Sequence, residues 1–334
     1  MRLHYYHARQ GNFGDDLNGW LWDRLLPAGW DAGDNTLLVG IGTILDRTIP
    51  SAQKTVVFGS GAGYQSPPRG FGGTTWQVLS VRGPLTAQIL ALPSAKAVTD
   101  GAALLAMLPE CTPLPESERH GVVFMPHHYA METGIWHEIC VMAGVELIDP
   151  RSESRESIQR IRRARLVLAD AMHAAIVADT LRVPWLPLVT SAEINTFKWV
   201  DWTRSLGLPY VPVFLPPTSA LESFRAMTLT FRGRNFAVAQ PSTDALLADC
   251  ARRWRKDQNV CHRTLCDINH GLFLLGTRLL MMASCNRQNT GLVAAAAIME
   301  ETTRKTPYLS NENTLRQKIN QLADSLEYLR NQVR

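Results

Sequence analysis

Short apolar runs alternate with amphipathic segments over the first two thirds of the chain. The runs expected to form strands are Leu3–Tyr6, Leu37–Val39, Thr55–Phe58, Gln77–Ser80, Val122–Met125, Val145–Ile148, Leu166–Ala169 and Trp185–Leu188. Between several of them the spacing predicts helices, over Asp16–Leu26, Pro84–Leu90, Ile135–Ala143, Ser157–Ala164 and Ala171–Leu181. Strands that alternate with helices predict an α/β fold whose parallel sheets are covered on both faces.

The segment 109–121 interrupts this pattern with Pro113, Pro115 and four charged residues. It predicts a linker between two α/β domains, residues 1–110 and 119–215. Two such domains that face each other leave a cleft at the carboxyl ends of their strands, where open α/β folds bind ligands.

Residues 216–334 have a mostly helical pattern, with one strand expected near Asn235–Ala239. At the end of the chain, apolar residues recur at alternating steps of four and three: Leu315, Ile319, Leu322, Leu326, Leu329 and Val333. This spacing predicts an amphipathic helix. We favour packing against the chain's own core, and the alternative is a homodimer formed through this helix.

Composition and charge describe an ordinary globular protein. Of the 334 residues, 46% are apolar and 19% charged, and the net charge of +4 is small. No basic run is interleaved with aromatic residues, so no nucleic-acid partner is expected. The first residues lack the apolar stretch of a secretory signal, and the most apolar window, Gly271–Ala283, is too short to span a bilayer. We expect a cytoplasmic protein, and contact with the inner face of the cell membrane stays open.

The six cysteines are scattered along the chain. Cys261, His262, Cys266 and His270 lie close together, but their spacing matches no standard zinc pattern. We therefore expect free thiols, no metal and no cofactor.

Glycine-rich loops follow three of the predicted strands. The loop 11–18 contains Asn12, Gly14, Asp15 and Asp16 and opens a helix that Asp16 can cap. Free amides at that helix start could hold an anion, although a plain strand-to-helix turn explains the pattern equally well.

Two further loops contain Gly42 and Gly61. Neither fits the dinucleotide fingerprint or the P-loop. They allow a ligand to approach the backbone closely, and tight packing of small residues is the alternative.

Arg82 stands at the end of a predicted strand, just before the helix that Pro84 opens. Its planar guanidinium suits a carboxylate or a phosphate in the cleft. The alternative is a structural ion pair, with Asp100 as the suggested partner.

His173 follows the buried strand that ends at Ala169. With Asp170 as the N-cap, the histidine falls in the first turn of a helix. The helix dipole lowers the pKa of such a histidine and a bound anion raises it again, which suits proton transfer near neutral pH. A purely structural histidine is the alternative.

Lys198, Trp199 and Trp202 lie close together after the last strong strand. They could form a phosphate contact beside an aromatic wall for a sugar. A tryptophan-rich domain junction is the alternative.

The order of these pieces resembles the polysaccharide pyruvyl transferases. Segments 169–173, 181–185 and 197–202 are similar to the bacterial exopolysaccharide branch, the xanthan and succinoglycan ketal pyruvate transferases. The resemblance covers about residues 1–215. It implies a fold similar to the B-type glycosyltransferases, with two Rossmann-like domains facing a cleft, and phosphoenolpyruvate as the donor.

The resemblance also implies roles for particular residues. Arg82 matches a family arginine associated with phosphoenolpyruvate, and His173 matches the family histidine proposed as catalytic. Many members carry an arginine two residues before that histidine, where this chain has Ala171. The missing positive charge would then come from Lys198 or from one of Arg162, Arg163 and Arg165.

The reaction implied is transfer of pyruvate from phosphoenolpyruvate to a sugar of an exopolysaccharide repeat unit, with a lipid-linked oligosaccharide as the expected acceptor. The product is a pyruvate ketal, and phosphate is released. Arg82 and Lys198 would hold the anionic groups, His173 would transfer protons, and Asp15 or Asp16 would be a base. The other expected contacts to substrate are Asn12, Gly14, Gly42, Gly61 and Trp199.

Two alternatives stay open. A nucleotide-sugar glycosyltransferase of the same fold would need a late acidic residue for ribose, and Glu193 is the candidate. The chain could also be a non-catalytic component of an exopolysaccharide assembly.

Overall fold

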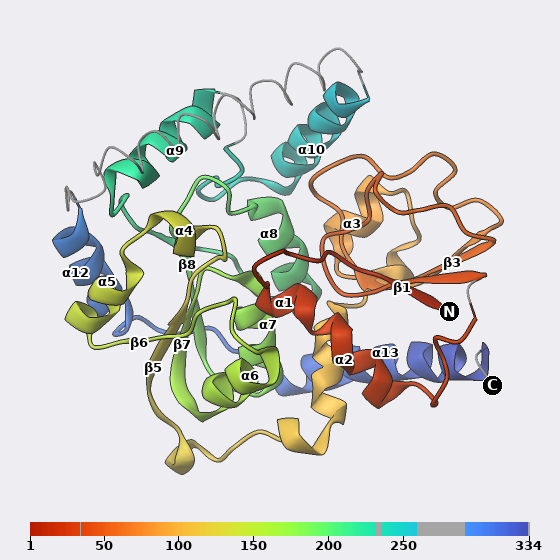
Figure 1. Cartoon of the computed structure of the whole chain (residues 1–334), viewed down its shortest axis with the longest axis horizontal. Helices are drawn as coiled ribbons and strands as arrows, with labels where there is room; N and C mark the ends of the chain where they lie inside the picture. Colours follow the sequence, from red (N-terminus) through yellow and green to blue (C-terminus); the bar gives the residue numbers. More distant parts are fainter. Residues whose placement is uncertain (34, 232–234, 259–290, 333–334) are drawn as a thin grey trace.

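The structure is a computed structural model that describes residues 1–334 except 34, 232–234, 259–290 and 333–334. Two parallel sheets are covered by helices, so the predicted α/β class is confirmed (Figure 1). Each strand predicted in the first two thirds of the chain is present within a few residues of its expected bounds.

The first sheet contains four parallel strands in the order of the chain. They are β1 (Arg2–His4), β2 (Thr36–Val39), β3 (Lys54–Ser60) and β4 (Trp76–Val81). The helical elements of this part are α1 (Phe13–Asp16), α2 (Asn18–Leu25), α3 (Pro84–Ile89) and the 3-10 helices η1 (Ser94–Lys96) and η2 (Gly101–Met107).

The helix predicted over Asp16–Leu26 is present as α2, after the separate short helix α1, and the expectation that Asp16 caps it is wrong because its N-cap is Leu17. Asp16 is the last residue of α1, and its carboxylate accepts a hydrogen bond from the backbone N–H of Asn12 at 2.7 Å. The Asp16 carboxylate therefore satisfies the backbone N–H of the N-cap residue of this short helix.

The second sheet has the order β6-β5-β7-β8-β9 and is also parallel. Its strands are β5 (His120–Met125), β6 (Glu146–Leu147), β7 (Ala164–Ala169), β8 (Trp185–Val189) and β9 (Val213–Phe214). Its helices are α4 (Ala130–Thr133), α5 (Trp136–Ala143), α6 (Ser154–Arg163), α7 (Met172–Thr180) and α8 (Thr196–Ser205). The strand order reverses between β5 and β7, and open parallel sheets bind ligands at the carboxyl ends beside such a reversal.

One hydrophobic cluster extends from the first sheet to one face of the second sheet. A second cluster contains the alternate residues of the second sheet, such as Phe124 and Leu168, and packs them against α5 and α12 (Leu292–Thr302). Helix α7 packs against η2, and α3 packs against α8, so helices join the two halves. The linker predicted at 109–121 contains two short 3-10 helices, Pro109–Cys111 and Glu116–Glu118, before β5 begins. The open cleft between two domains and the division at residues 110, 119 and 215 stay predictions.

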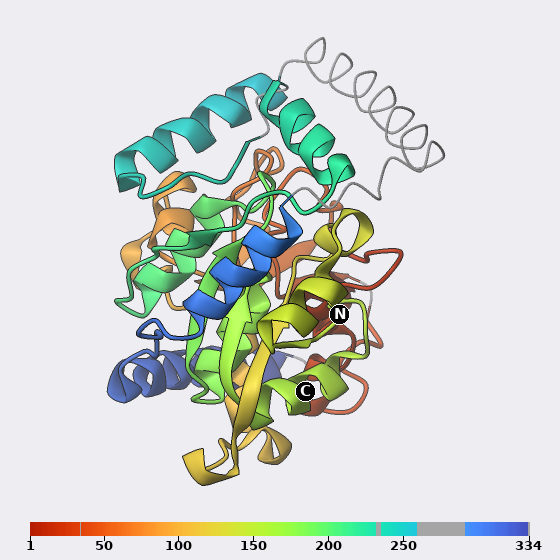
Figure 2. The same cartoon turned by 90° about the vertical axis from the view of Figure 1, so that its left-hand side faces the viewer.

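The last third is mostly helical, as expected. It contains α9 (Ala220–Phe231), α10 (Thr243–Asp257), α12 (Leu292–Thr302) and α13 (Glu312–Gln332). Helices α9 and α10 lie above the α/β region, while α12 packs against α5 (Figures 1 and 2).

The strand expected near Asn235–Ala239 is absent, and that prediction is wrong. This segment instead bonds to the loop before α8, where the N–H of Phe236 donates to the carbonyl of Ala192 and the N–H of Thr196 donates to the carbonyl of Phe236. With the bond from the N–H of Val238 to the Thr196 hydroxyl, these contacts go to a loop and to the start of a helix, so they form no ladder and the apolar run stays irregular.

Helix α13 packs against its own chain, which confirms the reading favoured from its spacing. Leu315, Leu322, Leu326 and Leu329 are buried, and the helix contacts η2 and β4 of the first half. Arg330 donates from Nε to the carbonyl of Leu25 at 2.8 Å, which ties the end of α13 to α2. The homodimer stays a prediction.

Some sequence features fall outside the described residues. These are the group Cys261, His262, Cys266 and His270, the apolar window Gly271–Ala283, and Val333. Within the described part, no helix is long and apolar enough to cross a membrane.

Candidate functional site

Five titratable side chains lie around Lys198 and experience its positive charge. They come from both halves of the chain and are Asp15, Asp100, His127, His128 and His173. We call Lys198 with Asp15, Asp100 and His173 the Lys198 centre, which His127 and His128 adjoin. It lies at the carboxyl ends of the strands, and β5 and β7, between which the strand order reverses, supply His127, His128 and His173.

His173 occupies the first turn of α7, as predicted, but Asp170 does not cap this helix. The N-cap residue is Ala171. The Asp170 carboxylate instead accepts from the N–H of His127 at 2.8 Å and from the N–H and hydroxyl of Thr190 at 3.0 and 2.7 Å. Asp170 therefore ties together the loops that follow β5 and β8.

The imidazole of His173 lies directly against Gly14. A Cβ at position 14 would collide with Nδ1 of the histidine, so only glycine permits this approach. The loop after β1 and the first turn of α7 are thus brought together, which joins two motifs singled out separately in the sequence.

Asp100 is the nearest carboxylate to His173. Its Oδ2 lies 3.8 Å from Nε2 of the histidine, and among the described residues neither of these buried atoms has a hydrogen-bond partner. Oδ1 of Asp100 accepts from the N–H of Ala102 at 3.0 Å, which fixes the carboxylate at the start of η2.

Burial moves the pKa values of this pair in opposite directions. It lowers the pKa of His173 to about 3, helped by the charges of Lys198 and Arg82, and it raises the pKa of Asp100 to about 6 against the charge of Arg82. At neutral pH, His173 is therefore an uncharged imidazole that can accept a proton.

The carboxyl group of Asp15 is partly protonated near neutral pH. Burial raises its pKa to about 7, although the charge of Lys198 opposes this shift. The side-chain amide of Asn12 donates to Oδ2. Gly42, at φ +132°, leaves room for Oδ1, from which a Cβ at that position would lie only 2.8 Å away.

Asp15→Asn should stabilise the fold at pH 8 more than at pH 5. A carboxyl whose pKa is raised on folding favours the folded state at low pH, and this contribution is lost as pH rises from about 3.8 towards about 7. We expect a melting temperature higher than that of the unchanged protein by a few degrees at pH 8, with a smaller difference at pH 5. Asp31→Asn, at an exposed position, is the control. A pH-independent effect of Asp15→Asn would contradict the assignment.

Lys198 lies in the first turn of α8. Asn195 caps this helix by accepting from the N–H of Phe197 at 3.1 Å, and its amide donates to the carbonyl of Gly63 at the same distance. Nζ of Lys198 donates to the hydroxyl of Tyr64 at 3.1 Å. The glycine-rich loop after β3 therefore holds the start of α8 and positions the ammonium group.

Arg82 does not offer its guanidinium to a cleft in this structure. The side chain is fully buried over Gly61, and it bonds to Asp201, Thr43 and the carbonyl of Ala62. The structural ion pair named as the alternative is present, with Asp201 in place of Asp100. The reason is that α8 presents Asp201 directly beside β4, at a separation of 3.1 Å from Nε.

Trp199 and Trp202 are buried and do not form a wall for a sugar. Trp199 stacks on Tyr210, and both tryptophans pack against Trp185. The tryptophan-rich junction named as the alternative is therefore observed.

The three arginines suggested as a source of positive charge lie far from His173. Arg162 and Arg163 end α6, and Arg165 begins β7, whereas His173 follows the other end of that strand. Of the expected cations, Lys198 and Arg82 both act on the pKa of His173, and the effect of Lys198 is the larger.

His127 and His128 were not identified from the sequence. They follow β5 directly after Pro126, and a polar pair at the end of an apolar strand was the signal that could have indicated them. Buried nitrogens of both rings, Nδ1 of His127 and Nδ1 and Nε2 of His128, have no hydrogen-bond partner within the described part of the chain.

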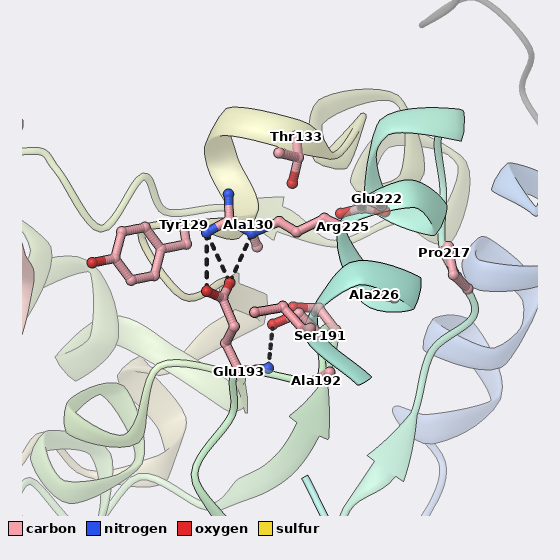
Figure 3. Close-up of a pocket in the computed structure, with 12 residues that line it drawn as sticks. Tyr129, Ala130, Thr133, Ser191, Ala192, Glu193, Pro217, Glu222, Arg225 and Ala226 are labelled. Carbon is pink, nitrogen blue, oxygen red and sulfur yellow. Dashed lines mark hydrogen bonds and ion pairs between the residues drawn. The ribbon is translucent and has the colours of Figure 1, made fainter. Parts of the chain in front are cut away.

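A small pocket lies beside these histidines, between the turn at Tyr129 and helix α9 (Figure 3). On its lining, Arg225 donates from Nε and Nη2 to the two carboxylate oxygens of Glu193, at 2.9 and 3.0 Å. Glu193 is therefore engaged in a bidentate pair, which weakens its case as the ribose contact of a nucleotide-sugar enzyme.

Among the residues that the structure describes, no group of three or more His, Cys, Asp or Glu side chains is arranged to hold a metal ion.

Comparison with known proteins gives an informative match. The chain is 40% identical over 245 residues to the succinoglycan biosynthesis protein ExoV of Rhizobium meliloti (strain 1021), and the alignment covers 73% of this chain and 77% of that protein. No protein-family model matches the chain.

Proposed function

Because the chain belongs to the polysaccharide pyruvyl transferase family, in its succinoglycan branch, we propose that it transfers pyruvate from phosphoenolpyruvate to a sugar of an exopolysaccharide repeat unit. The reaction would form a pyruvate ketal and release phosphate. The observation that carries the proposal is the Lys198 centre, which places a cation, a proton-bearing carboxyl and an uncharged imidazole together.

The chemistry needs these three kinds of group. A proton adds to the methylene carbon of phosphoenolpyruvate, and a sugar hydroxyl bonds to the neighbouring carbon. The bond between that carbon and the phosphate oxygen breaks, and a second hydroxyl closes the ketal. Of the two hydroxyl protons released, one replaces the proton given to the methyl group and the other leaves with phosphate. Positive charge on the central carbon and negative charge on the donor must both be stabilised.

We assign roles from charge and protonation state. Lys198 binds the anionic donor. Asp15, with a pKa of about 7, protonates the methylene carbon. His173 is uncharged, and the bound anionic donor raises its pKa from about 3, so that it takes the proton of the attacking hydroxyl. Two groups whose environments move their pKa values apart are suited to opposite acid–base roles. Gly14 and Gly42 support these residues through close approach of the backbone.

Arg82 acts through its charge and its ion pair. It lowers the pKa of Asp100 and holds α8 against β4 through Asp201. In this proposal Arg82 positions the centre and does not touch the donor.

The finer fold and location belong to the same proposal. Two Rossmann-like halves of glycosyltransferase B type would meet at the Lys198 centre, and the supporting observation is that side chains beyond both sheets contribute to it. The reaction would take place in the cytoplasm, with a lipid-linked acceptor presented at the inner face of the membrane.

Replacing Lys198 by methionine should weaken phosphoenolpyruvate binding by about tenfold to a hundredfold. A hydrogen bond to a charged group contributes about 1.5–3 kcal/mol, and methionine retains the packing without the charge. Calorimetry with phosphoenolpyruvate measures the effect. Tyr64→Phe is the control, because it removes the hydroxyl at Nζ and keeps the ammonium; unchanged affinity in Lys198→Met would remove this residue from the donor site.

One incubation tests the function itself. The protein is mixed with phosphoenolpyruvate and lipid-linked oligosaccharides, and mass spectrometry detects pyruvate on the sugar while a phosphate assay follows the second product. Thermal stabilisation by a nucleotide sugar, and none by phosphoenolpyruvate, would favour the glycosyltransferase alternative. Absence of any turnover would favour a non-catalytic component.

A further inference from the structure

The turn 127–129 presents buried ring nitrogens that the mechanism above does not use. Nδ1 of His127 and both nitrogens of His128 lack hydrogen-bond partners among the described residues. An uncharged imidazole carries one N–H donor and one acceptor lone pair, and leaving such groups unpaired in the interior is costly. A bound molecule with both donors and acceptors would satisfy them.

Charge indicates the class of that molecule. Burial lowers the pKa of His128 to about 4 and that of His127 well below 6.5, and Lys198 and Arg225 oppose a further positive charge on either ring. Both rings are therefore uncharged at pH 7 and do not attract an anion. Hydroxyl groups, each a donor and an acceptor, match uncharged imidazoles.

The neighbouring pocket has the same character. The guanidinium of Arg225 is paired with Glu193 and lies 5.2 Å from the centre of the Tyr129 ring, so its charge is already compensated (Figure 3). The Tyr129 ring lies 4.0 Å from that of His128.

We propose that the turn 127–129, with the Glu193–Arg225 pair behind it, binds hydroxyl groups of the acceptor saccharide. The inference rests on the proposed function for the identity of this ligand. Its position is consistent with that role, since the His128 ring lies 4.0 Å from that of Tyr129, which lines the pocket, and the charge of Lys198 also acts on His128. A hydroxyl held there is next to the anion held by Lys198, as transfer between two substrates requires.

The test separates sugar binding from donor binding. Saturation-transfer NMR with methyl β-D-glucopyranoside and methyl β-D-galactopyranoside reports the sugar, and thermal stabilisation by phosphoenolpyruvate reports the donor. His128→Phe removes both ring nitrogens and keeps a ring against Tyr129, while His128→Asn restores an amide donor and acceptor. His137→Ala, at an exposed histidine on α5, is the matched control.

The unchanged protein and His137→Ala should bind at least one glycoside, and His128→Phe should bind it about tenfold more weakly, with partial recovery in His128→Asn. Stabilisation by phosphoenolpyruvate should be the same in all four proteins. If the phenylalanine variant does not fold, His128→Ala gives the same comparison. The proposal is overturned if the unchanged protein binds neither glycoside, if His128→Phe binds as tightly as the control, or if it loses phosphoenolpyruvate instead.

Failure of the proposed function has a different signature. In that case phosphoenolpyruvate would not stabilise even the unchanged protein, whether or not the glycosides bind.

Discussion

Replacing His173 by alanine should reduce turnover by about a hundredfold or more, the usual scale for loss of a general acid–base group. The side chain lies in the first turn of α7, against Gly14 and 3.8 Å from Asp100, and its uncharged state at neutral pH suits a base. Its Nε2 has no hydrogen-bond partner among the described residues, so it can contact a substrate hydroxyl. The rate of phosphate release with donor and acceptor measures the effect.

The controls separate chemistry from folding. His173→Ala should still be stabilised by phosphoenolpyruvate, because Lys198 is intact, and it should unfold cooperatively. His137→Ala, at an exposed position, should keep its full rate. A near-normal rate in the His173 variant would show that the histidine is structural.

Replacing Asp201 by alanine should lower the free energy of unfolding by about 3–5 kcal/mol, the scale for a buried ion pair that loses one partner. The change leaves the Arg82 charge buried without its carboxylate. It also removes the acceptor of two hydrogen bonds from Thr86, from the N–H at 2.9 Å and from the hydroxyl at 2.6 Å. These contacts join β4 and α3 to α8, so the loss falls on the interface between the two halves.

Urea unfolding measures this effect, and two further variants serve as controls. Glu110→Ala breaks an exposed pair with Arg24 and should cost about 0–1 kcal/mol. The double variant Arg82→Met with Asp201→Leu removes both charges and should recover part of the loss. A cost below about 1 kcal/mol for Asp201→Ala would mean that Arg82 finds another partner.

The strands were predictable because parallel strands covered on both faces appear as uninterrupted apolar runs. Val167, Leu168 and Ala169 in β7 are all fully buried, for example. β9 was missed because it is only two residues long and lies between prolines. The apolar run at 235–239 has the composition of a strand, but its position in the fold offers it only a loop as a partner.

Site residues were predictable where the chemistry is local. His173 follows a strand end and Lys198 begins a helix, and both features can be read from neighbouring residues. The ion-pair partner of a side chain cannot be read in this way. Arg82 pairs with Asp201, which lies 119 positions further along the chain, and not with nearby Asp100. Burial is equally non-local, which is why the altered pKa values of Asp15 and Asp100 had no signature in the sequence.

Helix α13 has a consequence for biosynthesis. It contacts η2, which ends at Met107, yet it begins only at Glu312. Roughly 200 residues separate the two, so at about 5–20 residues per second the ribosome needs on the order of 10–40 s to supply the covering helix. During that time the apolar surface that Leu322 and Leu326 later cover is open to solvent or to a chaperone. Nascent chains that terminate early should therefore aggregate even when both sheets have been translated in full.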